Sequence, residues 1–196
     1  MALSENLQKL YDMLSCCTYN GAQHTHILIE ETDQLAKLKK VTLKAPNGDW
    51  FSFCPDEGRK CKRLQASSNL VIMSPLLKIG EKHDHHRACD CVVLINKNEQ
   101  ITALYIDLKS GNPVGYKGQF QSTRQFVRYA LGLLEEFHGI KLTLAQERFA
   151  VLYGGEQSPL NKTTTVPKPI KTTQPDAPYK KEVSNAAELK MNELLV

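Results

Sequence analysis

The sequence C-D-C-V-V-L-I at residues 89–95 is followed by I-T-A-L-Y-I-D-L at residues 101–108. Both runs are apolar and rich in β-branched or aromatic residues, which favours strands. The polar residues 96–99 separate them, so the pattern predicts an antiparallel hairpin. We expect this hairpin to form the centre of the fold.

Ionisable residues interrupt both predicted strands. Alternate residues of a strand share a face, so Asp107 and Lys109 point the same way, while Ile106 and Leu108 point into the opposite layer. An ionised group among Leu, Ile and Val needs a partner or a metal. If the strands pair, Asp90 and Asp107 converge on one divalent cation, with Lys109 beside a nucleophilic water or an anionic substrate. This arrangement suits phosphodiester hydrolysis.

Asp90, Asp107 and Lys109 resemble the signature of the PD-(D/E)xK phosphodiesterase superfamily, which includes restriction endonucleases and RecB-like nucleases. The resemblance covers about residues 85–153. It implies an α/β, restriction-endonuclease-like core with a mixed central sheet flanked by helices. It further implies that Asp90 and Asp107 bind Mg²⁺ or Mn²⁺ and that Lys109 positions water or stabilises the transition state. The Leu108 carbonyl is a further candidate ligand.

Two other features of the resemblance lie outside the hairpin. Gln125-Phe126-Val127-Arg128-Tyr129 is similar to the Q-x-x-x-Y element of RecB-like nucleases, and a spacing of four puts Gln125 and Tyr129 on one helical face. There they would hold the lysine, the metal-bound water or the nucleic-acid backbone. The family often has an additional upstream acid. The candidates for it here are Glu5, Asp12, Glu30 and Glu31.

The charge of the chain limits how it can bind nucleic acid. Lys and Arg number 25 and Asp and Glu 21, a formal net charge of +4, which excludes a polybasic, histone-like mode. Phosphate contacts must therefore come from local patches, with DNA favoured over RNA. Arg124 and Arg128, one turn apart beside Gln125 and Tyr129, form the first candidate patch. The second consists of Arg59, Lys60, Lys62 and Arg63.

The flanking sequence predicts the rest of the domain. Leu7, Leu10 and Leu14 have helical spacing after Ser4, residues 26–30 form a strand, and a short helix is expected over 32–39. Residues 41–44 and 50–54 flank a Pro-Asn-Gly-Asp turn, which predicts a second hairpin. A long helix over 117–137 buries a stripe from Phe120 to Phe137 and ends at Gly139. A strand at 149–153 closes a nuclease-like domain of residues 1–155.

The C-terminal region has a different composition. Residues 156–183 are rich in proline and threonine, which predicts an extended or disordered linker. Residues 184–196 carry apolar residues that we interpret as an amphipathic helix capped by Ser184. We expect this helix to dock on a protein partner or on the domain itself.

Other functions and sites stay open. A catalytically inactive module that binds nucleic acid or a partner would carry the same fold. His83, His85 and His86, with Cys89 and Cys91 and completed by Cys54 and Cys61, are zinc-ligand types, although the two thiols at 89 and 91 more often pack as small apolar residues on the face opposite Asp90. The first twenty residues lack a secretory signal and no apolar run is long enough for a membrane span, so we expect an intracellular protein, cytoplasmic or nuclear.

Overall fold

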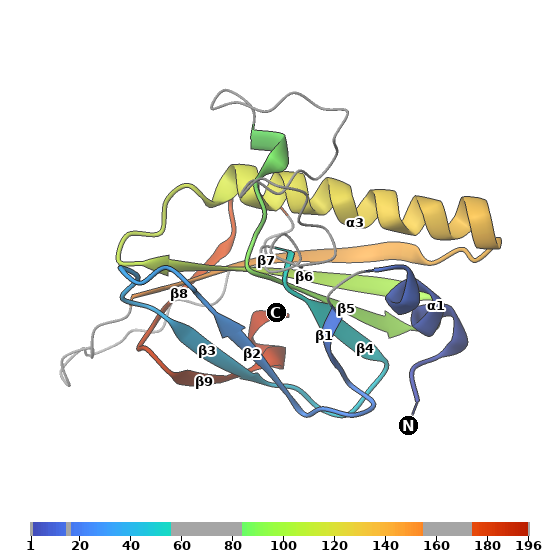
Figure 1. Ribbon diagram of the computed structural model, residues 1–196, viewed down its shortest axis with the longest axis horizontal. Coiled ribbons are helices and arrows are strands. Elements are labelled where there is room, and N and C mark those ends of the chain that lie inside the picture. The colour runs from blue at the N-terminus through green and yellow to red at the C-terminus, as the bar shows by residue number, and fades with distance from the viewer. Residues whose placement is uncertain (1, 15–16, 56–83, 155–173, 196) are drawn as a thin grey trace.

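The computed structural model describes residues 2–14, 17–55, 84–154 and 174–195, which form three layers (Figure 1). The middle layer is a six-stranded mixed sheet in the order β1-β4-β5-β6-β7-β8. Helices α1 (Glu5–Met13) and α3 (Tyr116–His138) cover one face, and a three-stranded sheet, β2-β3-β9, covers the other. The strands are β1 (Cys17–Asn20), β2 (His26–Glu30), β3 (Lys40–Lys44), β4 (Trp50–Phe53), β5 (Cys91–Lys97), β6 (Gln100–Ser110), β7 (Thr143–Gly154), β8 (Tyr179–Val183) and β9 (Ala187–Lys190).

The central hairpin is confirmed. β5 and β6 pair antiparallel from Cys91 opposite Ile106 to Lys97 opposite Gln100. Asn98 and Glu99 form the turn with φ of 54° and 62°, the left-handed conformations that tight hairpin turns require. After β6 the chain crosses through α3 and returns as β7, parallel to β6. The α/β class and the mixed sheet are therefore as the sequence predicts.

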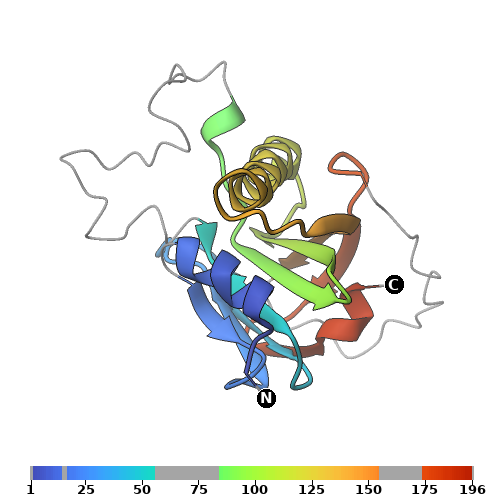
Figure 2. The same cartoon turned by 90° about the vertical axis from the view of Figure 1, so that its right-hand side faces the viewer.

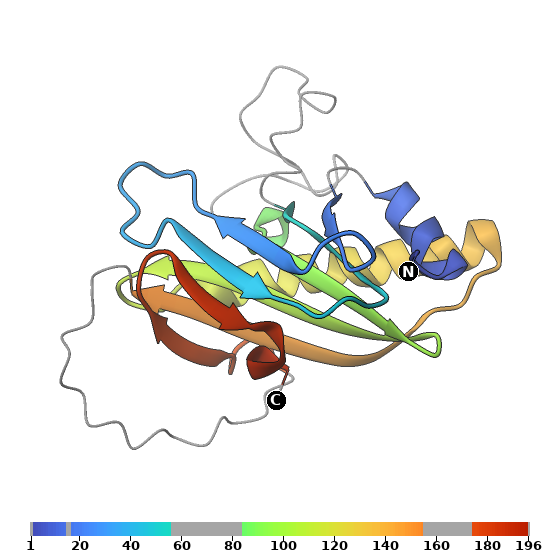
Figure 3. The same cartoon turned by 90° about the horizontal axis from the view of Figure 1, so that it is seen from below.

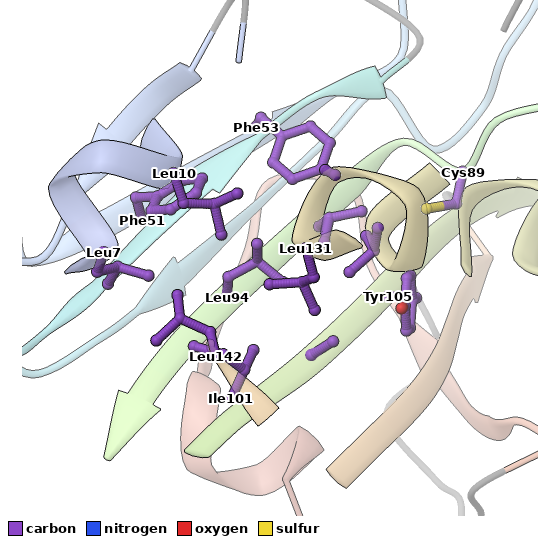
Figure 4. Packing of buried hydrophobic residues seen from close by; sticks show 14 of the residues in the cluster. Leu7, Leu10, Phe51, Phe53, Cys89, Leu94, Ile101, Tyr105, Leu131 and Leu142 are labelled. Atoms are coloured by element: carbon purple, nitrogen blue, oxygen red, sulfur yellow. The ribbon is translucent and has the colours of Figure 1, made fainter. Parts of the chain in front are cut away.

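The side chains of β6 divide between two cores. Ile101, Ala103 and Tyr105 pack under the helices, whereas the even-numbered residues Leu104 to Leu108 pack against the small sheet. Figure 4 shows Leu7 and Leu10 of α1 meeting Leu94, Ile101 and Leu131 in the first core. The alternation places Asp107 and Lys109 on the helical side of the sheet. The expectation of flanking helices holds for this face alone, since β2, β3 and β9 cover the other.

The predicted hairpin of residues 41–44 and 50–54 is wrong. Both strands exist, but β3 pairs with β2 and β9, and β4 pairs with β1 and β5, so the turn carries the chain from one sheet to the other. Trp50 is buried, and its indole Nε1 donates to the Pro46 carbonyl at 2.7 Å. Gly21 packs against the Trp50 ring so closely that a Cβ at position 21 would lie 2.2 Å from Trp50 Nε1. Burial of Trp50 therefore outweighs the local turn preference.

The C-terminal helix is also wrong. Residues 187–190 form β9, parallel to β3, and a 3₁₀ turn, η2, follows at Met191–Leu194 (Figure 3). Leu189, Met191 and Leu194 are buried between the two sheets. Within the predicted linker, Tyr179–Val183 forms β8 beside β7, and residues 155–173 lie outside the described part. Residues 174–195 thus belong to the same folded body as residues 2–154, not to an appendage.

Two smaller expectations also fail. Residues 32–39 form a loop instead of a helix, held by hydrogen bonds from the N–H groups of Lys37 and Leu38 to Ser110 Oγ at 2.7 and 3.1 Å. Phe137 is 73% exposed, although Phe120, Val127, Leu131 and Leu134 are buried as predicted.

No helix in the described part of the chain is long and apolar enough to cross a membrane. The ribbon seen end-on shows α1 and α3 together on the helical face (Figure 2).

Candidate active site

Asp90, Asp107 and Lys109 come together where the central hairpin opens. Asp90 directly precedes β5, and its Oδ2 accepts the backbone N–H of Leu108 at 2.5 Å. Asp107 and Lys109 lie near the end of β6, with Lys109 Nζ 2.7 Å from Asp107 Oδ2. Because Cys91 pairs with Ile106, the register brings the residue before β5 opposite Asp107. The two carboxyl groups are close enough that, after burial, the charge of Asp107 is the main cause that raises the pKa of Asp90.

The electrostatics of this cluster favour bound cations. Asp107 is fully buried, and burial raises its pKa to about 6, although the neighbouring Lys109 lowers it. Burial and then the charge of Asp107 raise the pKa of Asp90 well above its usual value. Lys109 is thus the near cation for the buried carboxylate of Asp107 and the partly buried carboxylate of Asp90. A further positive charge would stabilise the form in which both are ionised.

The donor set fits a magnesium-type ion. Both carboxylate oxygens of Asp107 are buried, and neither accepts a hydrogen bond of normal geometry from the described residues. The Lys109 ammonium is the charged group that lies beside them. Mg²⁺ keeps several waters and takes only one or two protein carboxylates, which Asp90 and Asp107 can supply. Within residues 2–14, 17–55, 84–154 and 174–195, no three His, Cys, Asp or Glu side chains are grouped closely enough to form a fuller metal cage.

Of the four upstream acids, Glu31 is the one that acts on this cluster. Burial raises the pKa of both Asp90 and Asp107, and the negative charge of Glu31 adds a smaller increase to each. Glu31 follows β2, where its N–H donates to the Lys39 carbonyl at 2.7 Å and its Oε1 accepts the Asp33 N–H at 2.9 Å. It therefore lies at the rim of the site, on the loop that Ser110 anchors.

The glutamine that contacts Lys109 is Gln119, which the sequence reasoning missed. Gln119 lies near the start of α3, and its Oε1 accepts a hydrogen bond from Lys109 Nζ at 2.8 Å. Gln125 and Tyr129 lie further along α3. Both are exposed, Tyr129 by 63%, and no hydrogen bond or ion pair among the described residues joins either to the acids or to Lys109. The sequence signal that could have identified Gln119 is its position as a polar residue in the first turns of the helix that follows the D-x-K strand.

Arg124 and Arg128 lie on the flank of α3 that faces away from Gln119. Thr123 faces the β5 side, where its Oγ1 accepts the Cys89 N–H at 3.0 Å, whereas Arg128 faces the β7 side, where it pairs with Glu147 at 2.8 Å. These arginines therefore do not adjoin the acids, contrary to their expected position. The other predicted basic patch, Arg59, Lys60, Lys62 and Arg63, lies outside the described residues.

The described residues do not form the zinc cluster either. Cys89 packs in the helical core and Cys91 in the core under the small sheet, so the two thiols point into different layers. The sequence predicts both on one face, but β5 begins only at Cys91 and strand alternation does not extend back to Cys89. Burial raises the pKa of the Cys89 thiol, as expected for a cysteine packed in an apolar core. Cys61 and His83 lie outside the described residues.

Comparison of the chain with protein-family models, with curated proteins and with solved structures finds no match.

Proposed function

We propose that this protein is a metal-dependent nuclease of the PD-(D/E)xK type, acting on nucleic acid, with DNA favoured. The observation that carries the proposal is the convergence of Asp90, Asp107 and Lys109 at the end of the central hairpin. The helix, strands, helix, strand order of α1, β4 to β6, α3 and β7 supports a restriction-endonuclease-like core.

Each residue of the cluster has a distinct role in this proposal. Asp90 and Asp107 hold Mg²⁺ or Mn²⁺, with the Leu108 carbonyl as a further ligand. Once bound, the ion would polarise the scissile phosphate and lower the pKa of a water. Lys109 holds that water or the developing negative charge on the phosphate. Gln119 keeps the Lys109 ammonium pointed into the site, because its side-chain oxygen accepts one of the three ammonium protons.

One observation favours a second function. Because the described residues hold only two close carboxylates, the same fold would also serve as an inactive module that binds nucleic acid or a protein partner. Such a module would bind its ligand without cleaving it under any divalent ion.

Cleavage assays separate these functions. The purified full chain is incubated with end-labelled single- and double-stranded DNA and RNA, with Mg²⁺, Mn²⁺ or EDTA. We expect metal-dependent cleavage that Asp107→Asn and Lys109→Met abolish. Asp176→Asn and Lys141→Met, which change the same charges at exposed positions, are the controls. Cleavage that persists in both site variants would sink the nuclease assignment.

A further inference from the structure

A hollow lies beside the first half of β7, away from the candidate active site. β8 pairs with β7 only from Ala150 to Gly154, so residues 144–148 of β7 have no paired strand on that edge within the described part of the chain. The hollow has a volume of about 470 Å³. Its lining includes Arg124 and Arg128 from α3, residues 144–148 of β7 with Arg148, and Gln174 from the segment before β8.

The charge of this hollow is positive. Three arginines line it, and Glu147 is the one acidic residue among the lining residues. Glu147 is itself held in place, since its Oε2 pairs with Arg128 at 2.8 Å and its Oε1 accepts the Tyr105 hydroxyl proton at 3.2 Å. One carboxylate cannot neutralise three guanidinium groups. The site therefore keeps an excess of about two positive charges.

The arginines are positioned and keep unused donors. Arg148 donates to the Glu147 and Leu195 carbonyls at 3.0 and 3.4 Å, which anchors its guanidinium at the rim. Arg124 Nε is buried without a hydrogen-bond partner among the described residues. This Nε is closed off from solvent, so an anion in the hollow would bind the outer Nη groups of Arg124, for which the described residues provide no hydrogen bond. Guanidinium groups bind phosphate with two parallel hydrogen bonds, a geometry that lysine does not provide.

We propose that Arg124, Arg128 and Arg148 form a phosphate-binding site separate from the Asp90 and Asp107 cluster. Its ligand is a phosphate ester, carried by a free nucleotide or by a nucleic-acid strand. The hollow is larger than a single phosphate ion and has room for part of the attached sugar or base. The proposal does not depend on nuclease activity, because α3 lies between this site and Lys109.

Equilibrium binding to the full chain in EDTA tests the proposal without cleavage. The probes are a nucleoside monophosphate, followed by calorimetry, and a fluorescent 12-nucleotide single strand, followed by anisotropy. Arg124→Gln should weaken binding about tenfold, the loss expected for one charge-assisted interaction. Glu147→Gln should strengthen binding, because it removes the competing carboxylate. Lys141→Gln, at the far end of α3, loses the same charge as Arg124→Gln and is the matched control.

Each outcome decides the proposal. Loss of nucleotide binding in Arg124→Gln, with gain in Glu147→Gln, supports a site for free nucleotides. The same pattern for the single strand alone supports a strand-binding site, and its salt dependence should fall by about one counterion in Arg124→Gln. The proposal is overturned if neither probe binds, or if Arg124→Gln and Lys141→Gln bind equally. Both binding measurements are made in EDTA, where metal-dependent cleavage does not occur, so a failed cleavage assay leaves this result independent. Thermal unfolding checks that each variant is folded.

Discussion

Lys109 Nζ donates a hydrogen bond of 2.8 Å to Gln119 Oε1, which joins the end of β6 to the first turns of α3. The same ammonium lies 2.7 Å from Asp107 Oδ2. Two elements therefore position the lysine: β6, which also carries Asp107, and α3, which crosses above the sheet. The contact makes the lysine geometry depend on how α3 packs on the sheet.

Gln119→Leu should lower the cleavage rate about 10- to 100-fold, because it removes an acceptor from a charged donor. The metal concentration for half-maximal activity should stay within about twofold, since Gln119 contacts no carboxylate in the described structure. Gln125→Leu is the matched control and should retain wild-type activity. The reverse ranking of the two variants would show that the Q-x-x-x-Y element, and not Gln119, serves Lys109.

Asp107→Asn should stabilise the metal-free protein at pH 8 while it abolishes cleavage. Burial raises the pKa of Asp107 from 3.8 to about 6, so the folded state holds the proton more tightly than the unfolded state. Stability from this group is therefore lost as the pH rises from about 4 to about 6. The amide removes that cost, and we expect a gain of about 1–3 kcal/mol in the free energy of unfolding.

Urea unfolding in EDTA at pH 4 and pH 8 measures this effect. The gain should be present at pH 8 and small at pH 4, where both the wild type and the variant are neutral at this position. Asp176→Asn, at a half-exposed site, should show no such pH dependence. A variant that is less stable than the wild type at pH 8 would contradict the assignment of a buried carboxylate whose ionisation destabilises the fold.

Divalent ions should stabilise the folded protein. Mg²⁺ or Mn²⁺ binds ionised carboxylates, so each should raise the melting temperature more at pH 7.5 than at pH 5.5. Asp107→Asn should abolish the shift. Glu31→Gln should reduce it, because the charge of Glu31 acts on both Asp90 and Asp107. Glu30→Gln, the adjacent exposed acid, is the control, and an equal loss in both variants would remove Glu31 from the site.

Leu194→Ala should destabilise the whole fold by about 2–4 kcal/mol, the usual cost of a cavity in a core. Leu194 is 2% exposed and packs with Leu189 and Met191 between the two sheets. Glu188→Ala, an exposed neighbour on β9, should change stability by less than about 1 kcal/mol. Equal melting temperatures for Leu194→Ala and the wild type would indicate a separate C-terminal segment instead of a core strand.

Local sequence patterns predict the elements that are stabilised by contacts between residues close in the sequence. The β5–β6 hairpin follows from two apolar runs with a polar turn, and α3 follows from its apolar stripe and Gly139, which adopts a left-handed φ of 65°. The juxtaposition of Asp90 with Asp107 also follows from the sequence. Once the turn of the antiparallel hairpin is placed, its register puts residue 90 opposite residue 107.

Long-range packing decides the remaining features. The turn at 46–49 and the tail at 187–195 have local preferences for a hairpin and a helix, but each gains more by burying Trp50, or Leu189 and Met191, between layers. The sequence by itself determined the acids, the lysine and the strands that carry them. Only the tertiary structure decided that Gln119 meets Lys109, that the charge of Glu31 acts on the site, and that three arginines line one hollow. These contacts join elements that are far apart in the sequence, and no local sequence pattern relates them.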